Sequence, residues 1–193
     1  MTEKRAFSVK LVCETDLMMH QFNGKDQEKE LENLPEREQA EKHAYRSPEG
    51  YLAVPRTWLK GTFMEAVERI AGRKWRAEKA SYAPRVMVEP EWVMLEPQEY
   101  EIDRRSVPSP ETRGVRNRSF CIRPIIRGWS LSFRLVTTVP DSADSLREKL
   151  EYAGREIGMG SNRPNGYGRF KVTEFKEVTP ERSTAERSEA ERS

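Results

Sequence analysis

The chain has 193 residues, of which 36% are hydrophobic and 34% are charged. About 70 apolar side chains suffice for one compact core but make two independent cores improbable. A net charge of +2 is not the strongly basic balance typical of a nucleic-acid-binding domain, although a net charge does not tell where the charges lie. No apolar run approaches the roughly 20 residues of a membrane span. The first ten residues lack the apolar core of a secretory signal, so we expect a cytoplasmic protein with no membrane contact.

The first third of the chain predicts a strand, a charged insert and a helix. Apolar residues alternate over 7–11, which indicates a strand. Residues 26–49 hold eight acidic and four basic side chains with few large apolar ones, so we expect a solvated, partly helical segment. Apolar residues at helical spacing then predict a helix over about 58–71, with Thr57 as its N-cap and Gly72 at its C-terminal end.

Three apolar segments follow that predict strands. The segment 86–95 contains Pro90, which restricts it to an edge strand or a bulge. The segments 120–126 and 129–136 are predicted to be two halves of one strand, with Gly128 at a bend between them.

The last third predicts a helix, a glycine-rich loop and a final strand. Asp141 or Ser142 is the expected N-cap of the helix. The loop covers 158–168, and the strand covers 170–175.

The predicted order is strand, helix, strand, strand, helix, strand, which is the ferredoxin-like (RRM-like) βαββαβ arrangement of an α+β protein. We expect a single domain over 1–177. It would carry an acidic insert after the first strand, at about 25–49, and an arginine-rich insert between the middle strands, at about 97–118. The composition of 178–193 predicts a disordered tail.

Cysteines and histidines are too few to suggest a metal site or a cofactor. Cys13 and Cys121 lie in apolar, strand-like segments and are expected to be small buried hydrophobic residues in a reducing compartment. Besides them the chain has only His20 and His43, so a zinc site would need carboxylates to complete it. We therefore expect no metal and no cofactor.

The glycine-rich loop has the residue types that bind a polyanion carrying aromatic faces. Its glycines permit positive φ and a close approach of the backbone to a ligand, and their N–H groups can hold a phosphate. Arginines add bidentate donors, and a tyrosine offers a ring for base stacking. The candidate residues are Gly158, Gly160, Asn162, Arg163, Gly166, Tyr167, Gly168 and Arg169. The alternative is a tight loop whose glycines only end the preceding helix.

A second candidate surface is rich in arginine. Between residues 104 and 127 there are seven arginines and one acid, Glu111, which gives a local excess of six positive charges and a strong local field. The arginines are Arg104, Arg105, Arg113, Arg116, Arg118, Arg123 and Arg127. A solvated basic loop without a function is the alternative.

Two segments resemble those of the RAMP superfamily, the repeat-associated proteins of CRISPR effector complexes. YLAVPRTWLKG at 51–61 resembles the isoleucine-proline-glycine-serine-serine-leucine-lysine-glycine signature that opens the first helix of these proteins. IGMGSNRPNGYGRF at 157–170 resembles their glycine-rich loop, in type, order and position. The resemblance covers about 7–175.

This resemblance implies a diverged, short backbone-type subunit that binds the backbone of single-stranded RNA, such as a guide RNA, beside copies of itself or other RAMP subunits. Single-stranded DNA stays open as a ligand. The resemblance also implies that Lys60 faces the RNA backbone and that the arginine-rich insert is a hairpin folding over the RNA. Lys60 lies in the first turn of the predicted helix, where N–H groups favour an anion, and Arg56, Thr57 and Gly61 beside it would join the same phosphate site. The alternative is that Lys60 is only solvated. Arg56 and Thr57 replace the glycine-serine pair of the signature, and Trp58 stands where a small residue is usual.

Other functions stay open. In a RAMP-type RNA-processing endoribonuclease, which needs no metal, His20 would be the general base, because its ordinary pKa suits proton transfer near neutrality; otherwise it is a packing residue or an RNA contact. His43 is expected to be solvated. A virus-encoded mimic that binds other RAMP proteins is a third possibility. Opposite charges further suggest that the acidic insert of one copy pairs with the arginine-rich insert of the next.

Overall fold

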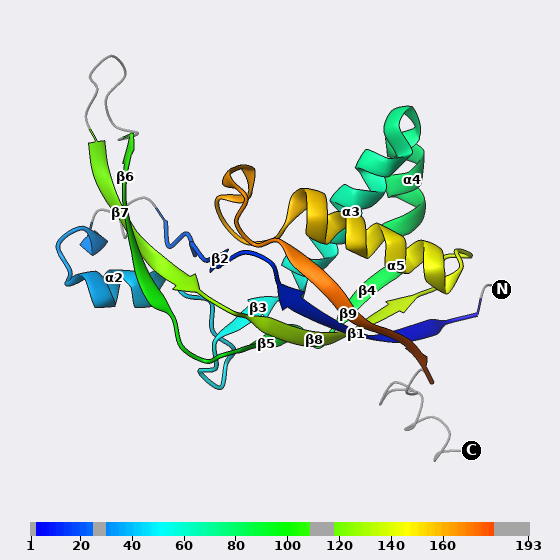
Figure 1. Cartoon of the computed structure of the whole chain (residues 1–193), viewed down its shortest axis with the longest axis horizontal. Coiled ribbons are helices and arrows are strands. Elements are labelled where there is room, and N and C mark those ends of the chain that lie inside the picture. The colour runs from blue at the N-terminus through cyan, green and yellow to red at the C-terminus, as the bar shows by residue number, and fades with distance from the viewer. Residues whose placement is uncertain (1–2, 25–29, 109–117, 180–193) are drawn as a thin grey trace.

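The computed structural model describes residues 3–24, 30–108 and 118–179 (Figure 1). The main sheet has six strands in the order β3-β5-β8-β1-β9, with β4 also paired to β8, and a smaller sheet has the order β2-β7-β6. The strands are β1 (Arg5–Cys13), β2 (Leu17–Met18), β3 (Ala53–Pro55), β4 (Val86–Glu89), β5 (Trp92–Glu96), β6 (Glu101–Pro108), β7 (Arg118–Ile126), β8 (Ser130–Thr137) and β9 (Phe170–Val178). The α-helices are α2 (Glu36–His43), α3 (Arg56–Ala71), α4 (Trp75–Tyr82) and α5 (Ala143–Tyr152).

The ferredoxin-like arrangement expected from the sequence is confirmed. The four strands β9, β1, β8 and β4 lie side by side in that order, α3 connects β1 to β4 through an insert, and α5 connects β8 to β9. Both helices lie on the same face of the sheet (Figure 1). This is the split βαβ topology, in which each helix crosses over between strands that are not neighbours.

The core lies between the sheet and these helices. In β1 the alternating residues Phe7, Val9 and Leu11 are fully buried, because successive strand side chains point to opposite faces. From α3, Leu59 and Phe63 pack against them in the same cluster. Burial of each large apolar side chain stabilises the fold by about 1.5–3 kcal/mol.

Two predicted strands are broken. The segment 86–95 forms β4 and β5, which pair with successive parts of β8 on the same edge, and Pro90 lies in the break. Residues 120–126 and 129–136 do not form one strand, because β7 pairs with β6 in the second sheet whereas β8 lies in the main sheet. Gly128, with φ of +57°, lies where the chain passes between the sheets.

Helix starts follow the predictions only in part. The first predicted helix, α3, begins at Arg56, two residues earlier than expected, with Pro55 at the N-cap and no side-chain cap. In α5 the cap is Ser142, whose Oγ accepts a hydrogen bond from the Ser145 N–H at 3.1 Å. The last strand extends to Val178, and the rest of the predicted tail, 180–193, lies outside the described residues. No helix in the described part of the chain is long and apolar enough to span a membrane.

The acidic insert, where it is described, is partly helical as expected, and most side chains of α2 are exposed, but one side of this helix packs against the hairpin. Helix α2 lies against β7 (Figure 1) and buries Ala40 and His43, so the expectation that His43 is solvated was wrong. Its Nδ1 lies 2.6 Å from the carbonyl oxygen of Ile122, and because a carbonyl only accepts, Nδ1 carries the hydrogen. Within one chain, Glu36 of α2 pairs with Arg104 of β6 at 3.3 Å, so one acid of this insert already meets the arginine-rich insert without a second copy.

Candidate nucleic-acid interface

The glycine-rich loop is hydrogen-bonded to β2 and to the residue before it. The N–H of Gly168 donates to the carbonyl of Asp16 at 2.8 Å, and the N–H of Ser161 donates to that of Met18 at 2.9 Å. Inside the loop, the N–H of Met159 donates to the carbonyl of Gly168 at 3.0 Å. These three bonds fix both arms of the loop against β2.

Packing requires some of the loop glycines, and one leaves its backbone open. At Gly168, where φ is +74°, an added Cβ would lie 1.9 Å from the carbonyl oxygen of Met159. At Gly160, with φ of +78°, it would lie 2.6 Å from that of Met18. At Gly166, with φ of +85°, nothing lies within 4 Å of the added atom. The loop is therefore a tightly packed turn at Gly160 and Gly168, with open space beside Gly166.

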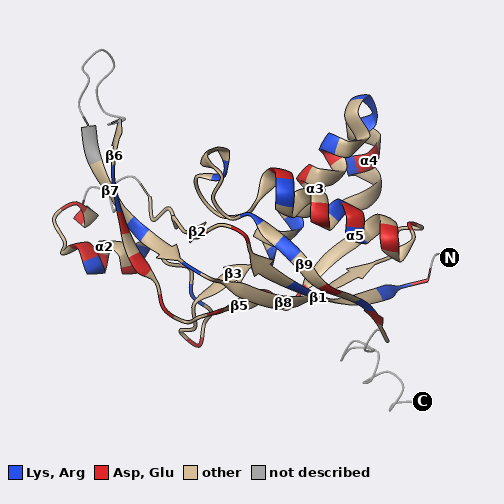
Figure 2. Cartoon of the chain, in the orientation of Figure 1, with Lys and Arg blue, Asp and Glu red and all other residues tan. Residues whose placement is uncertain are grey.

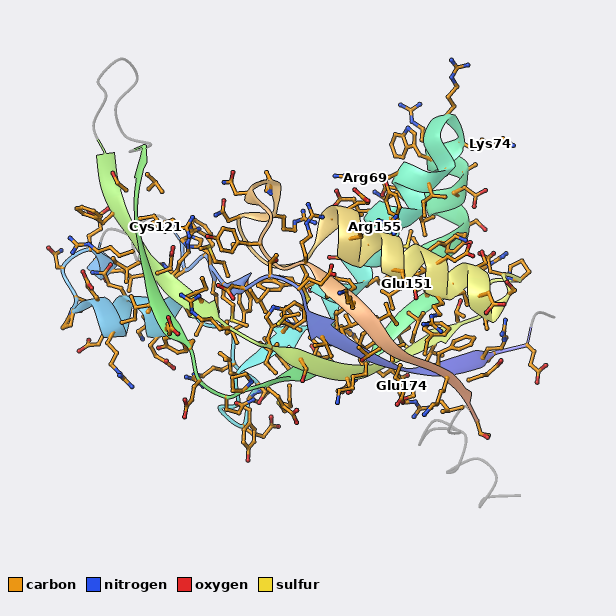
Figure 3. All side chains as sticks on the ribbon, viewed as in Figure 1. Arg69, Lys74, Cys121, Glu151, Arg155 and Glu174 are labelled. Atoms are coloured by element: carbon orange, nitrogen blue, oxygen red, sulfur yellow. The ribbon has the colours of Figure 1, made fainter. Side chains whose placement is uncertain are left out.

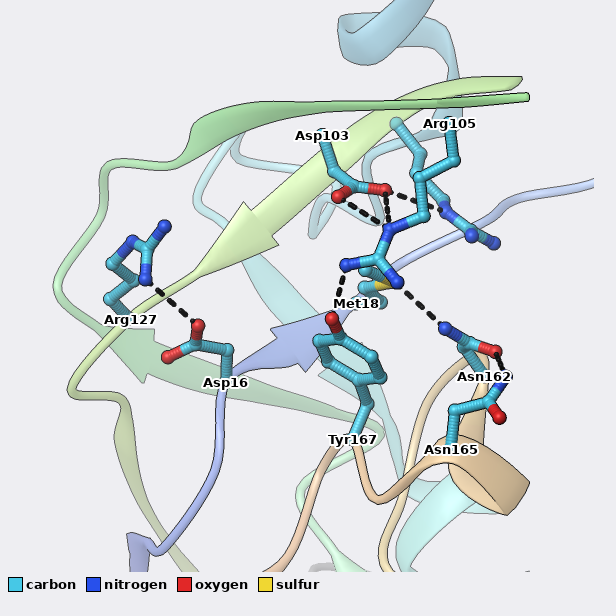
Figure 4. A network of polar contacts seen from close by, with 9 residues as sticks. Asp16, Met18, Asp103, Arg105, Arg127, Asn162, Asn165 and Tyr167 are labelled. Carbon is cyan, nitrogen blue, oxygen red and sulfur yellow. Dashed lines mark hydrogen bonds and ion pairs between the residues drawn. The ribbon is translucent and has the colours of Figure 1, made fainter. Parts of the chain in front are cut away.

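The loop also contacts the hairpin of β6 and β7 through an arginine and a tyrosine (Figure 4). The guanidinium of Arg105 lies 4.8 Å from the ring centroid of Tyr167 and donates a hydrogen bond to its hydroxyl. Its Nε also donates to Asp103 at 2.8 Å. The hydrogen bonds to Asp103 and to Tyr167 raise the pKa of Arg105, although burial opposes this. The hairpin and the loop, whose contacting residues are 62 positions apart in sequence, thus form one surface.

A hollow of about 340 Å³ lies beside this contact. Its lining residues are Thr15, Asp16, Asn165, Gly166 and Tyr167. The hydroxyl of Thr15 donates to the carbonyl of Gly166 at 2.7 Å and accepts from the N–H of Arg169 at 2.9 Å, which holds this wall in place. The hollow combines the ring of Tyr167 with the exposed side chain of Asn165, a combination that suits a base and its sugar-phosphate.

The described arginines of the hairpin are paired with carboxylates rather than exposed as a uniform basic face. Arg105 and Arg123 share Asp103, at 2.8 and 3.5 Å, and Arg127 pairs with Asp16 and Glu101 at 3.1 and 3.0 Å. Figure 2 shows red beside blue along β6 and β7. The sequence count of six excess charges began at Arg104, directly after Asp103 and Glu101, and so missed both acids. Arg113 and Arg116 lie outside the described residues, and only the backbone of Arg118 is described, at the start of β7.

Helix α3 contacts the loop with one face and carries the expected lysine on another. The hydroxyl of Thr62 donates to the carbonyl of Gly158 at 3.2 Å, and Arg163 pairs with Glu65 at 2.8 Å. Lys60 instead donates to the carbonyl of Ala83 at 2.8 Å, after the end of α4. Residues on a helix turn by about 100° each, so Lys60 lies about 160° away from Thr62.

The residues that were expected to form one site with Lys60 do not lie together with the glycine-rich loop. Arg56, four residues before Lys60, shares its face, because i and i+4 side chains lie one above the other. Arg56 and Thr57 are both exposed. Gly61 is exposed and has nothing within 4 Å of its Cβ position. The structure therefore brings together the loop, Arg105 and the β1–β2 segment, and it separates Arg56 and Lys60 from them.

The remaining loop residues contact one another or β2. The side chain of Asn162, at φ of +61°, lies with Nδ2 3.8 Å from the sulfur of Met18, and the amide of Asn165 donates to Asn162 Oδ1 at 2.7 Å. Nη1 of Arg169 is buried and has no hydrogen-bond partner among the described residues. Thr15, Asp16, Met18 and Asp103 were not selected from the sequence, because nothing local marks them and only the fold brings them to the loop.

His20 lies beside β7 of the hairpin and is half-buried. Its ring stacks on that of His43 at a centroid distance of 4.5 Å, and its Nδ1 lies 3.9 Å from the sulfur of Cys121. These contacts agree with a packing residue. Cys13 and Cys121 form no disulfide and are half-buried rather than buried as expected. Burial raises the pKa of the Cys13 thiol.

No family model matches the sequence, and neither does any curated protein. The fold, however, has solved relatives. One is a chain in the cryo-EM structure of the type III-B Cmr-beta bound to cognate target RNA, with a TM-score of 0.62 and 10% sequence identity. The match covers 92% of this chain and 61% of that chain, so the protein spans less than two thirds of its neighbour's length. The similarity establishes the shared ferredoxin-like fold.

Proposed function

We propose that this protein binds single-stranded RNA along the surface formed by the glycine-rich loop, β2 and the β6–β7 hairpin. In this proposal it is a backbone subunit of a CRISPR-like ribonucleoprotein in the cytoplasm. Its partners there are further copies of itself or other RAMP-type subunits. Binding is mostly independent of base sequence and weakens with salt, because it uses phosphate contacts and stacking.

The observation that carries the proposal is the contact between Arg105 and Tyr167 beside the hollow. It joins two segments that were selected separately from the sequence as polyanion-binding candidates. The guanidinium holds the tyrosine ring at the edge of the hollow, where the ring can stack on a base. The open space beside Gly166 lets a sugar-phosphate approach the loop closely.

The structural neighbour supports the choice of RNA and of a multisubunit setting. That chain belongs to a Cmr-beta structure containing cognate target RNA, and it has the same fold at 10% identity. A ferredoxin-like fold by itself hosts many functions, so the loop–hairpin surface, in addition to the fold, supports RNA as the ligand.

The decisive experiment compares two arginines with similar surroundings. Arg105 lies over Tyr167 and pairs with Asp103. Arg5 has similar contacts outside the proposed RNA-binding surface: it lies 4.9 Å from the Phe7 ring centroid and pairs with Glu177 at 2.7 Å. We expect Arg105→Gln to weaken binding of an oligouridine about tenfold, corresponding to about 1.4 kcal/mol, in a fluorescence anisotropy titration. Arg5→Gln should leave the affinity unchanged.

Equal affinities of the two variants would refute the proposed surface. RNA of short, defined length that copurifies with the protein in a large particle would support the assembly. A clean monomer that binds neither RNA nor single-stranded DNA at low salt would contradict the function itself, and stronger binding of oligodeoxythymidine would change the ligand from RNA to DNA.

A further inference from the structure

The turn between α3 and α4 carries a compact group of exposed cations that the proposed surface does not include. Helix α3 ends at Ala71, with Gly72 as its C-cap at φ of +53°, and the chain passes through a short 3₁₀ turn, Gly72–Lys74, into α4. All residues over 72–77 are exposed. We call Arg73, Lys74, Trp75 and Arg76 the α3–α4 tip.

The cations of the tip differ from the neighbouring cations in their ion pairing. Arg69 pairs with Glu65 at 2.6 Å, and Lys79 pairs with Glu68 at 2.8 Å. Among the described residues, no carboxylate forms an ion pair with any of the three tip cations. Figure 2 shows blue at the end of the helical projection, and Lys74 points away from the rest of the chain in Figure 3. This is a site of positive potential that attracts a polyanion.

The tip also exposes apolar and aromatic surface. Trp75 is 39% exposed and Ile70 is 49% exposed. The guanidinium of Arg76 lies 5.2 Å from the centroid of the Trp75 ring. A ring beside unpaired cations can stack on a base while the cations hold phosphates, which is how proteins bind single-stranded nucleic acid. An acidic polypeptide would use the charges but would gain no stacking from the ring.

The tip is held firmly on the core. The rings of Phe63 in α3 and Tyr82 in α4 lie 6.4 Å apart, and Lys60 donates to the carbonyl of Ala83 just after α4. Together with the ion pair of Lys79 and Glu68, these contacts fix α4 against α3. A platform of fixed geometry binds with less loss of conformational entropy than a mobile loop.

The tip and the loop project from the same side of the main sheet (Figure 1). Glu65, which pairs with Arg163 of the loop, precedes Lys74 by nine residues. Six of these residues lie in α3, which ends at Ala71, so at about 1.5 Å per residue the tip begins about 9 Å beyond Glu65, roughly three stacked nucleotides at about 3.4 Å each.

We infer that the α3–α4 tip is a second contact for the nucleic-acid strand that the glycine-rich loop binds. At the tip, Arg73, Lys74 and Arg76 bind phosphates and Trp75 stacks on a base. The choice of ligand rests on the proposed function, but the position does not. A strand leaving the glycine-rich loop along α3 would reach the tip after at least about three nucleotides, so the tip should matter only for longer ligands.

The test uses oligouridines of about 4 and about 16 nucleotides, titrated at several salt concentrations. We expect the triple variant R73Q/K74Q/R76Q to reduce the slope of log affinity against log salt by about 2 for the long oligouridine, since each single-strand phosphate contact contributes about 0.7. The short oligouridine should bind as it does to the wild type. Trp75→Ala should weaken binding of the long one about fivefold. The control, K4Q/K10Q/K176Q, removes the same charge from β1, β9 and the residue before β1, and it should leave both ligands unaffected.

The outcomes separate this inference from the proposed function. If the triple variant binds the long oligouridine with the same salt slope as the control variant does, the tip makes no contact and the inference is overturned, whatever Arg105→Gln does. If Arg105→Gln has no effect while the triple variant weakens binding of both lengths, the tip binds independently, and the proposed surface is wrong. Polyglutamate of equal charge that competes as well as oligouridine would overturn the choice of a nucleic acid as occupant.

Discussion

The packing of the glycine-rich loop can be tested by adding a single methyl group at Gly168. Its backbone has φ of +74°, where a residue other than glycine costs about 1 kcal/mol or more. The added Cβ would lie 1.9 Å from the Met159 carbonyl oxygen, well inside any real contact distance, so one arm of the loop must move. That movement breaks the bonds from Met159 N–H to Gly168 and from Gly168 N–H to Asp16, at about 1 kcal/mol each. The expected loss for Gly168→Ala is therefore about 3 kcal/mol or more.

Gly166 provides a matched control on the same loop. Its φ is +85°, but nothing lies within 4 Å of an added Cβ, so Gly166→Ala should cost only the conformational strain of about 1 kcal/mol. Urea unfolding followed by circular dichroism measures both free energies of unfolding, with the midpoint falling further for Gly168→Ala. Equal midpoints for the two variants would show that the close approach of the loop arms does not exist. They would refute the loop geometry on which the candidate interface depends.

Three further predictions concern residues around the core and the hairpin. Burial of the Asp141 carboxyl by itself would raise its pKa, but hydrogen bonds, first that from Lys149, hold the pKa below its ordinary value of 3.8. Asp141→Asn should therefore destabilise the fold by about 1–2 kcal/mol near neutral pH. The difference in free energy of unfolding from the wild type should shrink below about pH 4, because the wild-type carboxylate then takes up a proton. A difference that stays constant in urea titrations down to about pH 3 would contradict the depressed pKa of Asp141. Asp103→Ala leaves Arg123, whose side chain is only 12% exposed, without its carboxylate, and should cost about 2 kcal/mol in thermal or urea unfolding; a variant as stable as wild type would disprove the bridge. His20→Ala should lower stability by about 1–2 kcal/mol without changing any metal-independent cleavage of an RNA hairpin, whereas loss of such cleavage in this variant alone would make His20 catalytic.

The order of elements could be predicted because it depends on local signals. The alternation over 7–11 in β1 and the helical spacing in α3 express which face of each element is buried, and this periodicity is written into neighbouring residues. The break at Pro90 and the bend at Gly128 were visible for the same reason. What could not be seen was that the two sides of Gly128 belong to different sheets, because strand pairing depends on residues distant in sequence.

The site was predicted in its parts but not in its assembly. The loop glycines and Tyr167 stood out by composition, as did Arg105. That these two side chains contact each other follows from the position of the hairpin, which no local pattern encodes. Conversely, Lys60 has the sequence context of a helix start, but its side chain turns to Ala83, because a helix of this length presents only one face to the loop.

Sequence alone thus determined the fold class and located the glycine-rich loop, since period, glycine content and helix ends are properties of consecutive residues. Only the tertiary structure decided how the charges are distributed. Its ion pairs join Asp103 to Arg123 and Glu36 to Arg104 across long stretches of chain, whereas the cations of the α3–α4 tip have no such partner within the part of the chain that the structure describes. The physical reason is that Coulomb interactions act through space over a few ångströms, so the net charge of +2 acquires a meaning only when the folded chain sets which charges are neighbours.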